Sequence, residues 1–303
     1  MRVLINGLPL FSKRLADELQ KYDPASSYHF FDTYNSKWAQ LLFYLYLPFS
    51  DVVISMNGVT DNSGSLNLVL KRRKKLILQW MGTDALLAME RFQKGTIERK
   101  YIDYASNFVD SEWLFDEVKS LKVPVEYVYF KSATVEPCIE KYERISVVSY
   151  VAESRQEFYG MQKIAEIAKV FPAIDFHLYG LKNAEFPTTS NVHFHGWVAP
   201  EVFAERLKST PIFLRLTDHD GFSVSVIEAL AYGCEVIMSL PFELTHLATT
   251  TEEAIDKMLT VISTIEARGM TPNQTLIEAV KVRFNPEILA KNYIQKLKEI
   301  AGK

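Results

Sequence analysis

Short apolar segments alternate with amphipathic segments along most of the chain. The segments RVLIN at residues 2–6 and DVVISMNG at 51–58 are apolar runs of strand length. SKRLADELQKY, which follows the first run, places Leu15, Ala16 and Leu19 at helical spacing. Because strand-like and helix-like segments alternate, the pattern predicts parallel sheets that are covered by helices on both faces.

The alternation is interrupted by a polar segment at about residues 131–144. A second series of strand and helix patterns follows it, and an amphipathic helix with an Asn-Pro start ends the chain. With 303 residues, the chain is long enough for two domains of ordinary size. We therefore predict an N-terminal domain at 1–135, a C-terminal domain at 136–283, and a closing helix at 284–303 that can pack back on the N-terminal domain. Ligands are expected at the carboxyl ends of the strands, in a cleft between the two domains.

Composition narrows the class of protein. A hydrophobic content of 48% and a charged content of 23% are typical of a globular protein, and a net charge of −3 disfavours nucleic acid as a partner. Cys138 and Cys234 are too few for a disulfide framework, so we expect two buried thiols and a cytoplasmic location. The N-terminus predicts a first strand rather than a signal peptide. The longest apolar stretch, 38–49, is shorter than the ~20 residues that span a bilayer, so the chain is expected to be soluble or peripheral.

One stretch of the second domain, TDHDGFSVSVIEALAYGCEVIMS at 217–239, predicts a loop, a helix and a strand. The loop follows the apolar strand at 212–216 and therefore lies at a carboxyl end. The helix is expected to begin near Phe222 or Ser223, and the unpaired N–H groups and positive dipole of such a terminus are suited to a phosphate. Glu228 is a carboxylate among small and apolar residues of the helix. A carboxylate in such a place needs hydrogen-bond partners. The alternatives are that Glu228 faces solvent, that it binds a neighbouring backbone N–H group, or that it accepts hydrogen bonds from the paired hydroxyls of a ribose.

The order of residues in this stretch is an acidic residue, Gly, an aromatic residue, five residues, and Glu-Ala-x-Ala-x-Gly-x-x-Val. The matching residues are Asp220, Gly221, Phe222, Glu228, Ala229, Ala231, Gly233 and Val236. This order resembles the donor-binding signature of the GT-B glycosyltransferases, in particular the large retaining family numbered four. The resemblance implies two Rossmann-like domains with parallel sheets that face a central cleft. It also implies transfer of a sugar from a nucleotide-diphosphate sugar to a glycan, lipid-linked or small-molecule acceptor, with retention and with neither a cofactor nor a metal.

The resemblance assigns roles to the residues of the loop and helix. By resemblance, Glu228 binds the ribose of the donor, and Asp220 is a catalytic residue that helps to fix the hydroxyls of the donor sugar. The family usually has Glu at the first acidic position, where this chain has Asp220, so the shorter Asp is a departure from the family. The amides of Gly221, Phe222 and Ser223 are expected to face the diphosphate or the sugar.

The family also places an Arg and a Lys after the first strand of the second domain, where they neutralise the diphosphate. In the segment SRQEFYG, Arg155 matches the arginine and is the second predicted catalytic residue, while Tyr159 stands where the lysine is expected. Arg215, Lys163 and His219 are the other cations nearby.

The histidines and Arg215 leave alternatives open. Arg215 either contacts the diphosphate or pairs with an acid at the end of its strand. His219 either contacts the donor or is a solvated loop residue. His193 and His195 alternate with apolar residues and are expected to be structural.

Three residues of the first domain are candidate contacts. Gly7 follows the first strand, where family members often have a glycine-rich turn that contacts the donor phosphate or the acceptor. Trp80 and Asp84 lie in LQWMGTDALL, which resembles the stretch H-W-x-G-[ST]-D of related enzymes, and both are acceptor-side candidates. Asp84 alternatively caps the helix that follows it, and the two roles are compatible.

The apolar stretch at 38–49 and the basic run KRRKK at 71–75 allow peripheral contact with the inner face of a membrane. The alternatives are a helix that covers the sheet and a solvated helix end. Two other functions stay open. One is a GT-B-shaped nucleotide-sugar-binding or regulatory subunit without turnover, which the departures at Tyr159 and Asp220 favour. The other is a nucleotide-sugar epimerase, for which no acid/base set is obvious.

Overall fold

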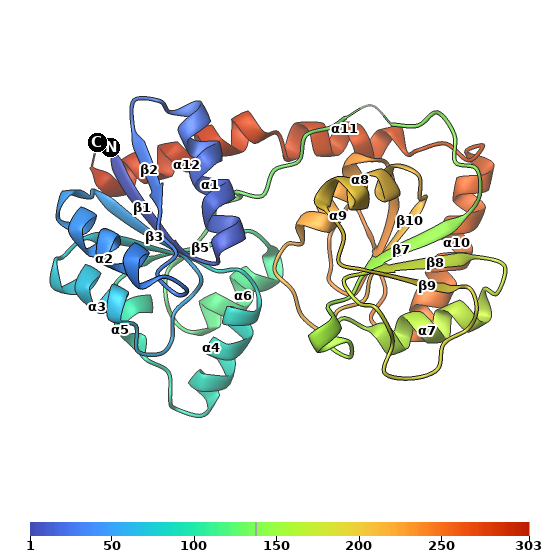
Figure 1. Cartoon of the computed structure of the whole chain (residues 1–303), viewed down its shortest axis with the longest axis horizontal. Coiled ribbons are helices and arrows are strands. Elements are labelled where there is room, and N and C mark those ends of the chain that lie inside the picture. Colours follow the sequence, from blue (N-terminus) through green and yellow to red (C-terminus); the bar gives the residue numbers. More distant parts are fainter. Residues whose placement is uncertain (137, 303) are drawn as a thin grey trace. The chain divides into compact units, whose positions relative to one another are not determined.

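The computed structural model describes residues 1–136 and 138–302, and the chain divides into two compact units (Figure 1). Unit 1 comprises Met1–Lys131 and Pro286–Lys303, and unit 2 comprises Ser132–Asn285. Pro137, in the predicted connection, and Lys303, at the end of the predicted closing helix, lie outside the described residues.

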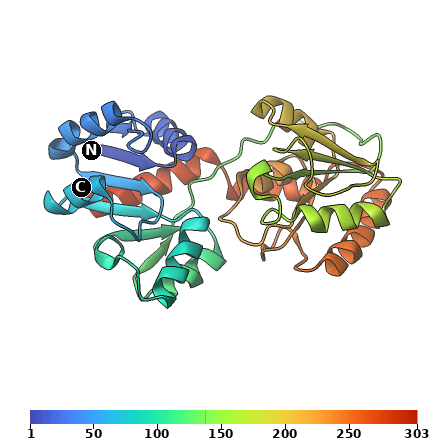
Figure 2. The same ribbon diagram turned by 60° about the horizontal axis from the view of Figure 1, so that its bottom comes forward.

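Unit 1 contains a parallel sheet of six strands in the order β2-β1-β3-β4-β5-β6. Figure 2 shows helices on both sides of this sheet. The central strand β3 is buried along its whole length, because both of its faces are covered. The strands are β1 (Arg2–Gly7), β2 (Ser27–Phe30), β3 (Val52–Met56), β4 (Lys75–Gln79), β5 (Ser106–Val109) and β6 (Val125–Tyr127).

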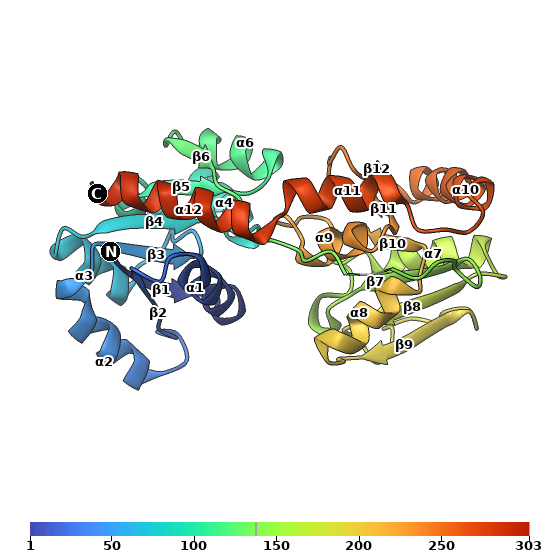
Figure 3. The same ribbon diagram turned by 90° about the horizontal axis from the view of Figure 1, so that it is seen from above.

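One face of this sheet is covered by α1 (Pro9–Tyr22) and α12 (Pro286–Ala301), which lie side by side although they are far apart in the sequence (Figure 1 and Figure 3). Tyr293 of α12 is fully buried, and its hydroxyl donates to the Gln79 side chain at 3.2 Å. The helix that closes the chain therefore packs on the N-terminal sheet. The helices on the other face are α2 (Lys37–Tyr46), α3 (Gly64–Lys71), α4 (Thr83–Gln93), α5 (Arg99–Ile102) and α6 (Glu112–Ser120), and the 3-10 turn η1 (Leu47–Phe49) follows α2.

Unit 2 repeats the architecture with a parallel sheet in the order β12-β11-β10-β7-β8-β9. Its strands are β7 (Ser146–Tyr150), β8 (Asp175–Tyr179), β9 (Val192–Gly196), β10 (Ile212–Arg215), β11 (Glu235–Met238) and β12 (His246–Leu247). Its helices are α7 (Met161–Val170), α8 (Pro200–Lys208), α9 (Val224–Ala231), α10 (Thr251–Ala267) and α11 (Gln274–Arg283), with the 3-10 turn η2 (Glu153–Arg155) before α7. The predicted fold class, two Rossmann-like α/β units with parallel sheets, is confirmed.

A buried carboxylate joins the end of unit 2 to its sheet. Glu235, at the start of β11, accepts hydrogen bonds from Arg268 at 2.8 Å and from Asn273 at 3.0 Å, and it lies 3.1 Å from Nε2 of His246. Burial raises the pKa of Glu235, but these three partners more than offset the rise and hold the pKa at about 2.

One prediction about buried residues needs correction. Cys234 is buried, but Cys138 is only half-buried; both thiols are free. The stretch at 38–49 forms α2 and η1, where Phe43 and Leu47 are fully buried in the core beside the sheet while other apolar side chains of the stretch are exposed. Within the described residues, no helix has the length and apolar character needed to cross a membrane.

Candidate functional site

The loop between β10 and α9 lies at the carboxyl end of a central strand of unit 2. β10 pairs with both β7 and β11 and is buried along its length. The Thr217 hydroxyl donates to the carbonyl of His219 at 2.8 Å, and the Ser239 hydroxyl donates to the carbonyl of Thr217. These hydrogen bonds fix the loop at the sheet edge where open parallel sheets bind ligands.

The N-terminus of α9 has no side-chain cap. The helix begins at Val224, with Ser223 at the N-cap position, and the Ser223 side chain makes no capping hydrogen bond. Its hydroxyl lies 2.8 Å from the hydroxyl of Ser225 instead. The first N–H groups of α9 and the positive end of its dipole are therefore available to an anion.

Both ends of α9 are held in place by packing. Phe222 is buried, and its ring centroid lies 4.7 Å from that of Phe242 and 5.4 Å from that of Phe284. Gly233 ends the helix in the left-handed region with a φ of 75°, and a Cβ there would lie 2.7 Å from the backbone nitrogen of Asn273. The helix is thus a firmly positioned element.

Asp220 forms an ion pair with Arg215. Nε of Arg215 donates to Oδ2 of Asp220 at 2.9 Å, and Nη2 donates to the same oxygen. The side chain of Arg215 is 7% exposed and that of Asp220 is 22% exposed. The guanidinium also lies 4.9 Å from the ring centroid of Tyr159 and donates to the carbonyl of Tyr150 at 3.4 Å. Of the two alternatives for Arg215, the structure shows the ion pair.

Arg155 lies in a segment that is bonded to the loop. It is exposed, and its guanidinium carbon lies 3.8 Å from the ring centroid of Phe158. The carbonyl of Phe158 accepts a hydrogen bond from the N–H of Asp218 at 2.9 Å. Nζ of Lys163 lies 3.5 Å from Oδ1 of the same aspartate. Lys163 and Arg215 each face an acid, whereas Arg155 presents its charge at the surface.

Two further polar residues, in α9 and in the loop before it, are partly or fully shielded from solvent. Glu228, in the middle of α9, is half-buried. Its charge contributes, after burial and Glu136, to the raised pKa of the Tyr232 phenol one turn later. His219 is 8% exposed, so the alternative of a solvated loop residue is wrong.

Gly7 and Trp80 of unit 1 support the backbone. Gly7 has a φ of 106°, and a Cβ there would lie 2.8 Å from the backbone of Met56 on β3. The Trp80 side chain is fully buried, and its Nε1 donates to the Asn107 side chain at 3.1 Å. Trp80 therefore has no surface with which to contact an acceptor in this conformation.

Asp84 ties two loops of unit 1 together. Its carboxylate accepts hydrogen bonds from the backbone N–H groups of Gly58 at 2.5 Å, Gly82 at 2.7 Å, Met81 at 3.0 Å and Ala85 at 3.1 Å. Burial raises the pKa of the carboxyl, and these donors oppose the rise. The N-cap of α4 is Gly82, so Asp84 is not at the N-cap position, but it binds the N–H groups there.

The histidines of β9 bond within the sheet. Nε2 of His193 lies 2.9 Å from Oδ1 of Asp175, and Nε2 of His195 lies 3.1 Å from Nδ1 of His177. Burial, ahead of the charge of nearby Arg206, lowers the pKa of His195. These contacts fit the structural role that the alternating pattern predicts.

Sequence reasoning missed an aromatic pair at the carboxyl edge of unit 2. Tyr150 ends β7, Trp197 directly follows β9, and their ring centroids are 6.0 Å apart. Trp197 is 76% exposed. The signal in the sequence was an aromatic residue at a strand end, in the position where ligands bind.

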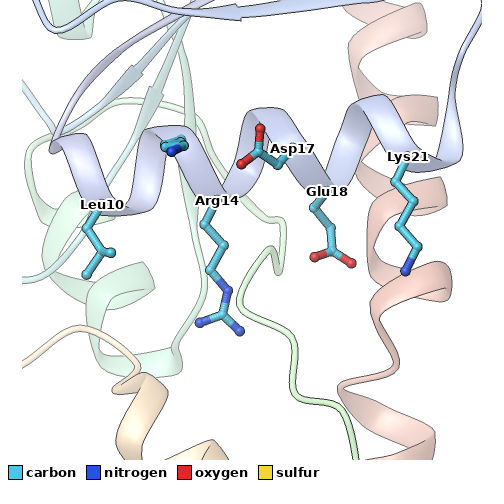
Figure 4. A pocket seen from close by; sticks show the side chains of 6 residues that line it. Leu10, Arg14, Asp17, Glu18 and Lys21 are labelled. Atoms are coloured by element: carbon cyan, nitrogen blue, oxygen red, sulfur yellow. The ribbon is translucent and has the colours of Figure 1, made fainter. Parts of the chain in front are cut away.

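A surface hollow of about 380 Å³ lies along α1 in unit 1 (Figure 4). Figure 4 shows Leu10, Arg14, Glu18 and Lys21 pointing to the same side of the helix. None of the candidate site residues lines this hollow, and both signs of charge are present along it. It therefore forms no part of the candidate site.

The sequence matches no protein-family profile and no curated protein. Solved structures, however, share its fold. Sucrose-phosphate synthase from Thermosynechococcus elongatus matches with a TM-score of 0.73 at 12% identity over 100% of both chains. HepE from Anabaena, in complex with UDP and glucose, matches with a TM-score of 0.67 at 12% identity over 98% of this chain and 99% of that chain.

A mutant of TarM from S. aureus, in complex with fondaparinux, alpha-GlcNAc-glycerol and UDP, matches with a TM-score of 0.64 at 15% identity. The match covers 86% of this chain and 59% of TarM, so the chain spans about three-fifths of the TarM length. UDP-GlcNAc 2-epimerase from Neisseria meningitidis, bound to UDP-GlcNAc, matches with a TM-score of 0.50 at 13% identity over 99% of this chain and 100% of that chain.

These likenesses define the class of fold. The chain has the two-unit GT-B fold of the glycosyltransferases, as the resemblance of the segment at 217–239 predicts. Because an epimerase shares this fold, and because the identities do not exceed 15%, the likeness by itself does not separate the two activities. Membership of family four stays a prediction.

Proposed function

We propose that the chain is a glycosyltransferase that moves a sugar from a nucleotide-diphosphate sugar to an acceptor. The observation that carries the proposal is that the N-terminus of α9, at the carboxyl edge of a parallel sheet, has no side-chain cap. The loop before this helix is hydrogen-bonded to the segment that contains the exposed Arg155. Structures of the same fold, HepE and TarM, contain UDP, which favours a UDP-sugar as the donor. The acceptor in the proposal is a glycan or a lipid-linked sugar.

In this proposal the diphosphate of the donor lies against the first turn of α9. The bond between the anomeric carbon and the phosphate oxygen breaks, the hydroxyl oxygen of the acceptor bonds to the anomeric carbon, and negative charge develops on the departing diphosphate, which takes up the proton of that hydroxyl. The N–H groups of α9 and the guanidinium of Arg155 stabilise that charge. Glu228 accepts hydrogen bonds from the ribose hydroxyls, and the exposed ring of Trp197 offers a face on which a nucleobase can stack. Transfer with retention and without a metal is part of the proposal.

The ion pair gives Asp220 a defined part in this scheme. Because Arg215 balances its charge and holds one of its oxygens, Asp220 acts as an acceptor of sugar hydroxyls rather than as a base. The pair also positions the side chain, which is one methylene shorter than the Glu of the resembling family. Asp220 is therefore expected to select the sugar through the hydroxyls that it contacts.

Turnover tests the proposal. The purified chain is incubated with UDP-, GDP- and ADP-sugars together with glycan and lipid-linked acceptors, and sugar transfer and nucleotide release are followed. We expect acceptor-dependent nucleotide release that falls on the order of 10²-fold in Arg155→Met. Lys257→Met, which removes an exposed cation from α10, is the matched control and should retain full activity.

A second function is favoured by the same ion pair. Because Asp220 already pairs with Arg215, and because Tyr159 replaces the expected lysine, the site also fits a nucleotide-sugar-binding or regulatory subunit without turnover. A donor that raises the melting temperature, with no transfer to any acceptor, would support the subunit. Conversion of a UDP-sugar in the absence of any acceptor would instead indicate an epimerase.

A further inference from the structure

Helix α2 and the turn η1 present an apolar stripe to solvent. The stripe consists of Trp38, Leu41, Leu45 and Phe49, whose exposed fractions are 67%, 45%, 58% and 68%. Their spacing of three and four residues places them along one side of the helix. Phe43, which is offset from this row, is fully buried. A surface helix normally has polar residues on its solvent side, but here the solvent side is apolar as well.

The surroundings of the apolar stripe contain little acid. From residue 33 to residue 50 the sequence has no Asp or Glu and one cation, Lys37. A longer acid-free segment runs from residue 62 to residue 83 and contains the run KRRKK.

A basic cluster, which we define as Arg2 and residues 71–75, lies at the η1 end of the stripe. Nζ of Lys74 donates to the carbonyls of the two residues that flank Phe49, at 2.7 and 2.8 Å. The guanidinium of Arg2 lies 5.9 Å from the ring centroid of Phe49. The other members of the run are exposed: Lys71, Arg72, Arg73 and Lys75. The apolar stripe thus ends in a group of cations.

The two units of the chain differ in net charge. Unit 1 contains 21 Lys and Arg against 17 Asp and Glu, whereas unit 2 contains 13 against 20. The net charge of −3 is therefore the sum of a positive unit and a more strongly negative one. Unit 1, which carries the stripe, is the part of the chain suited to an anionic partner.

We propose that the apolar stripe and the basic cluster dock unit 1 on an anionic lipid surface. The aromatic and aliphatic side chains enter the boundary between headgroups and acyl chains, and the basic cluster binds the lipid phosphates. A second copy of the chain fits less well, because a symmetric pair built on this face brings two positively charged units together. The docking surface involves unit 1 alone and does not depend on the donor site of unit 2.

Vesicle sedimentation tests the docking. The purified chain is mixed with vesicles of phosphatidylcholine and phosphatidylglycerol, and in parallel with vesicles of phosphatidylcholine alone. We expect binding to the anionic vesicles, weaker binding to the neutral ones, and a loss of the difference at high salt, because salt screens the charge contribution.

Two sets of substitutions separate the apolar from the charged contribution. The double variant Trp38→Ser with Leu45→Ser should lower the partition coefficient on both kinds of vesicle, by on the order of 10²-fold. The triple variant Lys71→Gln, Arg72→Gln and Arg73→Gln should lower it on anionic vesicles only, by about fivefold per charge. Lys74 is kept, since its hydrogen bonds hold η1 in place.

The matched controls lie in unit 2. Leu259→Ser removes an exposed apolar side chain, and Lys169→Gln with Lys257→Gln removes two exposed cations. Both controls should bind vesicles like the unmodified chain. A melting curve for each variant checks that it is folded.

Three results would overturn the proposal. The first is an unmodified chain that sediments with neither kind of vesicle at low salt. The second is vesicle binding that survives the apolar double variant unchanged. The third is self-association that the double variant abolishes, without any vesicle binding, which would assign the stripe to a second copy of the chain.

Discussion

The ion pair between Arg215 and Asp220 allows a quantitative prediction about the loop between β10 and α9. Arg215 is 7% exposed and donates to Asp220 through two of its nitrogens. Removing one partner of a buried ion pair costs about 3–5 kcal/mol, because the other charge stays buried without its partner. Asp220 is 22% exposed, so water reaches it and the lower end of that range applies. We therefore expect Arg215→Met to lower the free energy of unfolding by about 3 kcal/mol.

For a unit of this size, each kcal/mol corresponds to about 2–4 °C in the melting temperature, so the expected shift is about 6–12 °C. Urea unfolding of the unmodified chain, Arg215→Met, Asp220→Asn and the double variant completes a mutant cycle. We expect a coupling energy of about 2 kcal/mol, because the double variant leaves no buried charge behind. Effects of the two single substitutions that add to within about 0.5 kcal/mol would refute the reasoning.

The same variants test the part that Asp220 plays in the site. If Asp220 contacts the sugar, Asp220→Asn should keep its affinity for UDP but lose the additional affinity that the sugar of a UDP-sugar provides. Titration calorimetry with UDP and with UDP-sugars measures both quantities. An equal loss of affinity for UDP alone would place Asp220 at the nucleotide instead.

Three further predictions concern unit 2, two of them its framework and one its candidate site. Gly160→Ala should destabilise the unit by about 2 kcal/mol or more in urea, because Gly160 has a φ of 73° and a Cβ there would lie 2.2 Å from the carbonyl oxygen of Leu216. Glu235 has a pKa of about 2 against an unperturbed 4.5, so its stabilisation is present above about pH 4.5 and is lost as the pH falls through 2. Glu235→Gln should therefore lose about 3 kcal/mol at neutral pH and flatten the acid limb of the stability profile in urea unfolding. Arg155→Met should weaken UDP binding about 10- to 100-fold in titration calorimetry and leave the melting temperature of the free chain unchanged, since Arg155 is exposed and its contact is the ring of Phe158.

The sheets and the position of the loop between β10 and α9 could be predicted from the sequence for a physical reason. A strand such as β10, which is covered on both faces, is apolar up to Arg215 at its end, and the helix that covers the sheet follows it in the sequence. The loop between the two is then fixed at the carboxyl edge. The helix that contains Glu228 begins within two residues of the expected start, because Gly233 and the apolar pattern mark its extent.

The side-chain partners could not be predicted, because they depend on packing across the loops. The pairing of Arg215 with Asp220 was one of two open alternatives, and whether the two side chains meet depends on the conformation of the loop between them. The burial of Trp80 depends on Gly58, where a Cβ would lie 2.1 Å from the indole ring. The periodicity of α2 likewise shows that the helix is apolar but not which side of it meets the sheet.

The burial of His219 also depended on the three-dimensional arrangement. A histidine in a loop of polar residues is usually solvated, but the Thr217 hydroxyl bonds the His219 carbonyl and draws the loop onto the sheet. Such local hydrogen bonds leave no periodic signal in the sequence.

The central claim is that α9 binds a nucleotide diphosphate with its first turn and the ribose with Glu228. Titration calorimetry of UDP with the unmodified chain, with Glu228→Gln and with the control Glu266→Gln, an exposed position on α10, tests it most directly. Loss of a hydrogen bond to a charged group corresponds to about 1.5–3 kcal/mol, so we expect Glu228→Gln to bind UDP about 10- to 150-fold more weakly and the control to bind like the unmodified chain. An affinity for UDP that is the same in Glu228→Gln as in the unmodified chain would contradict the claim.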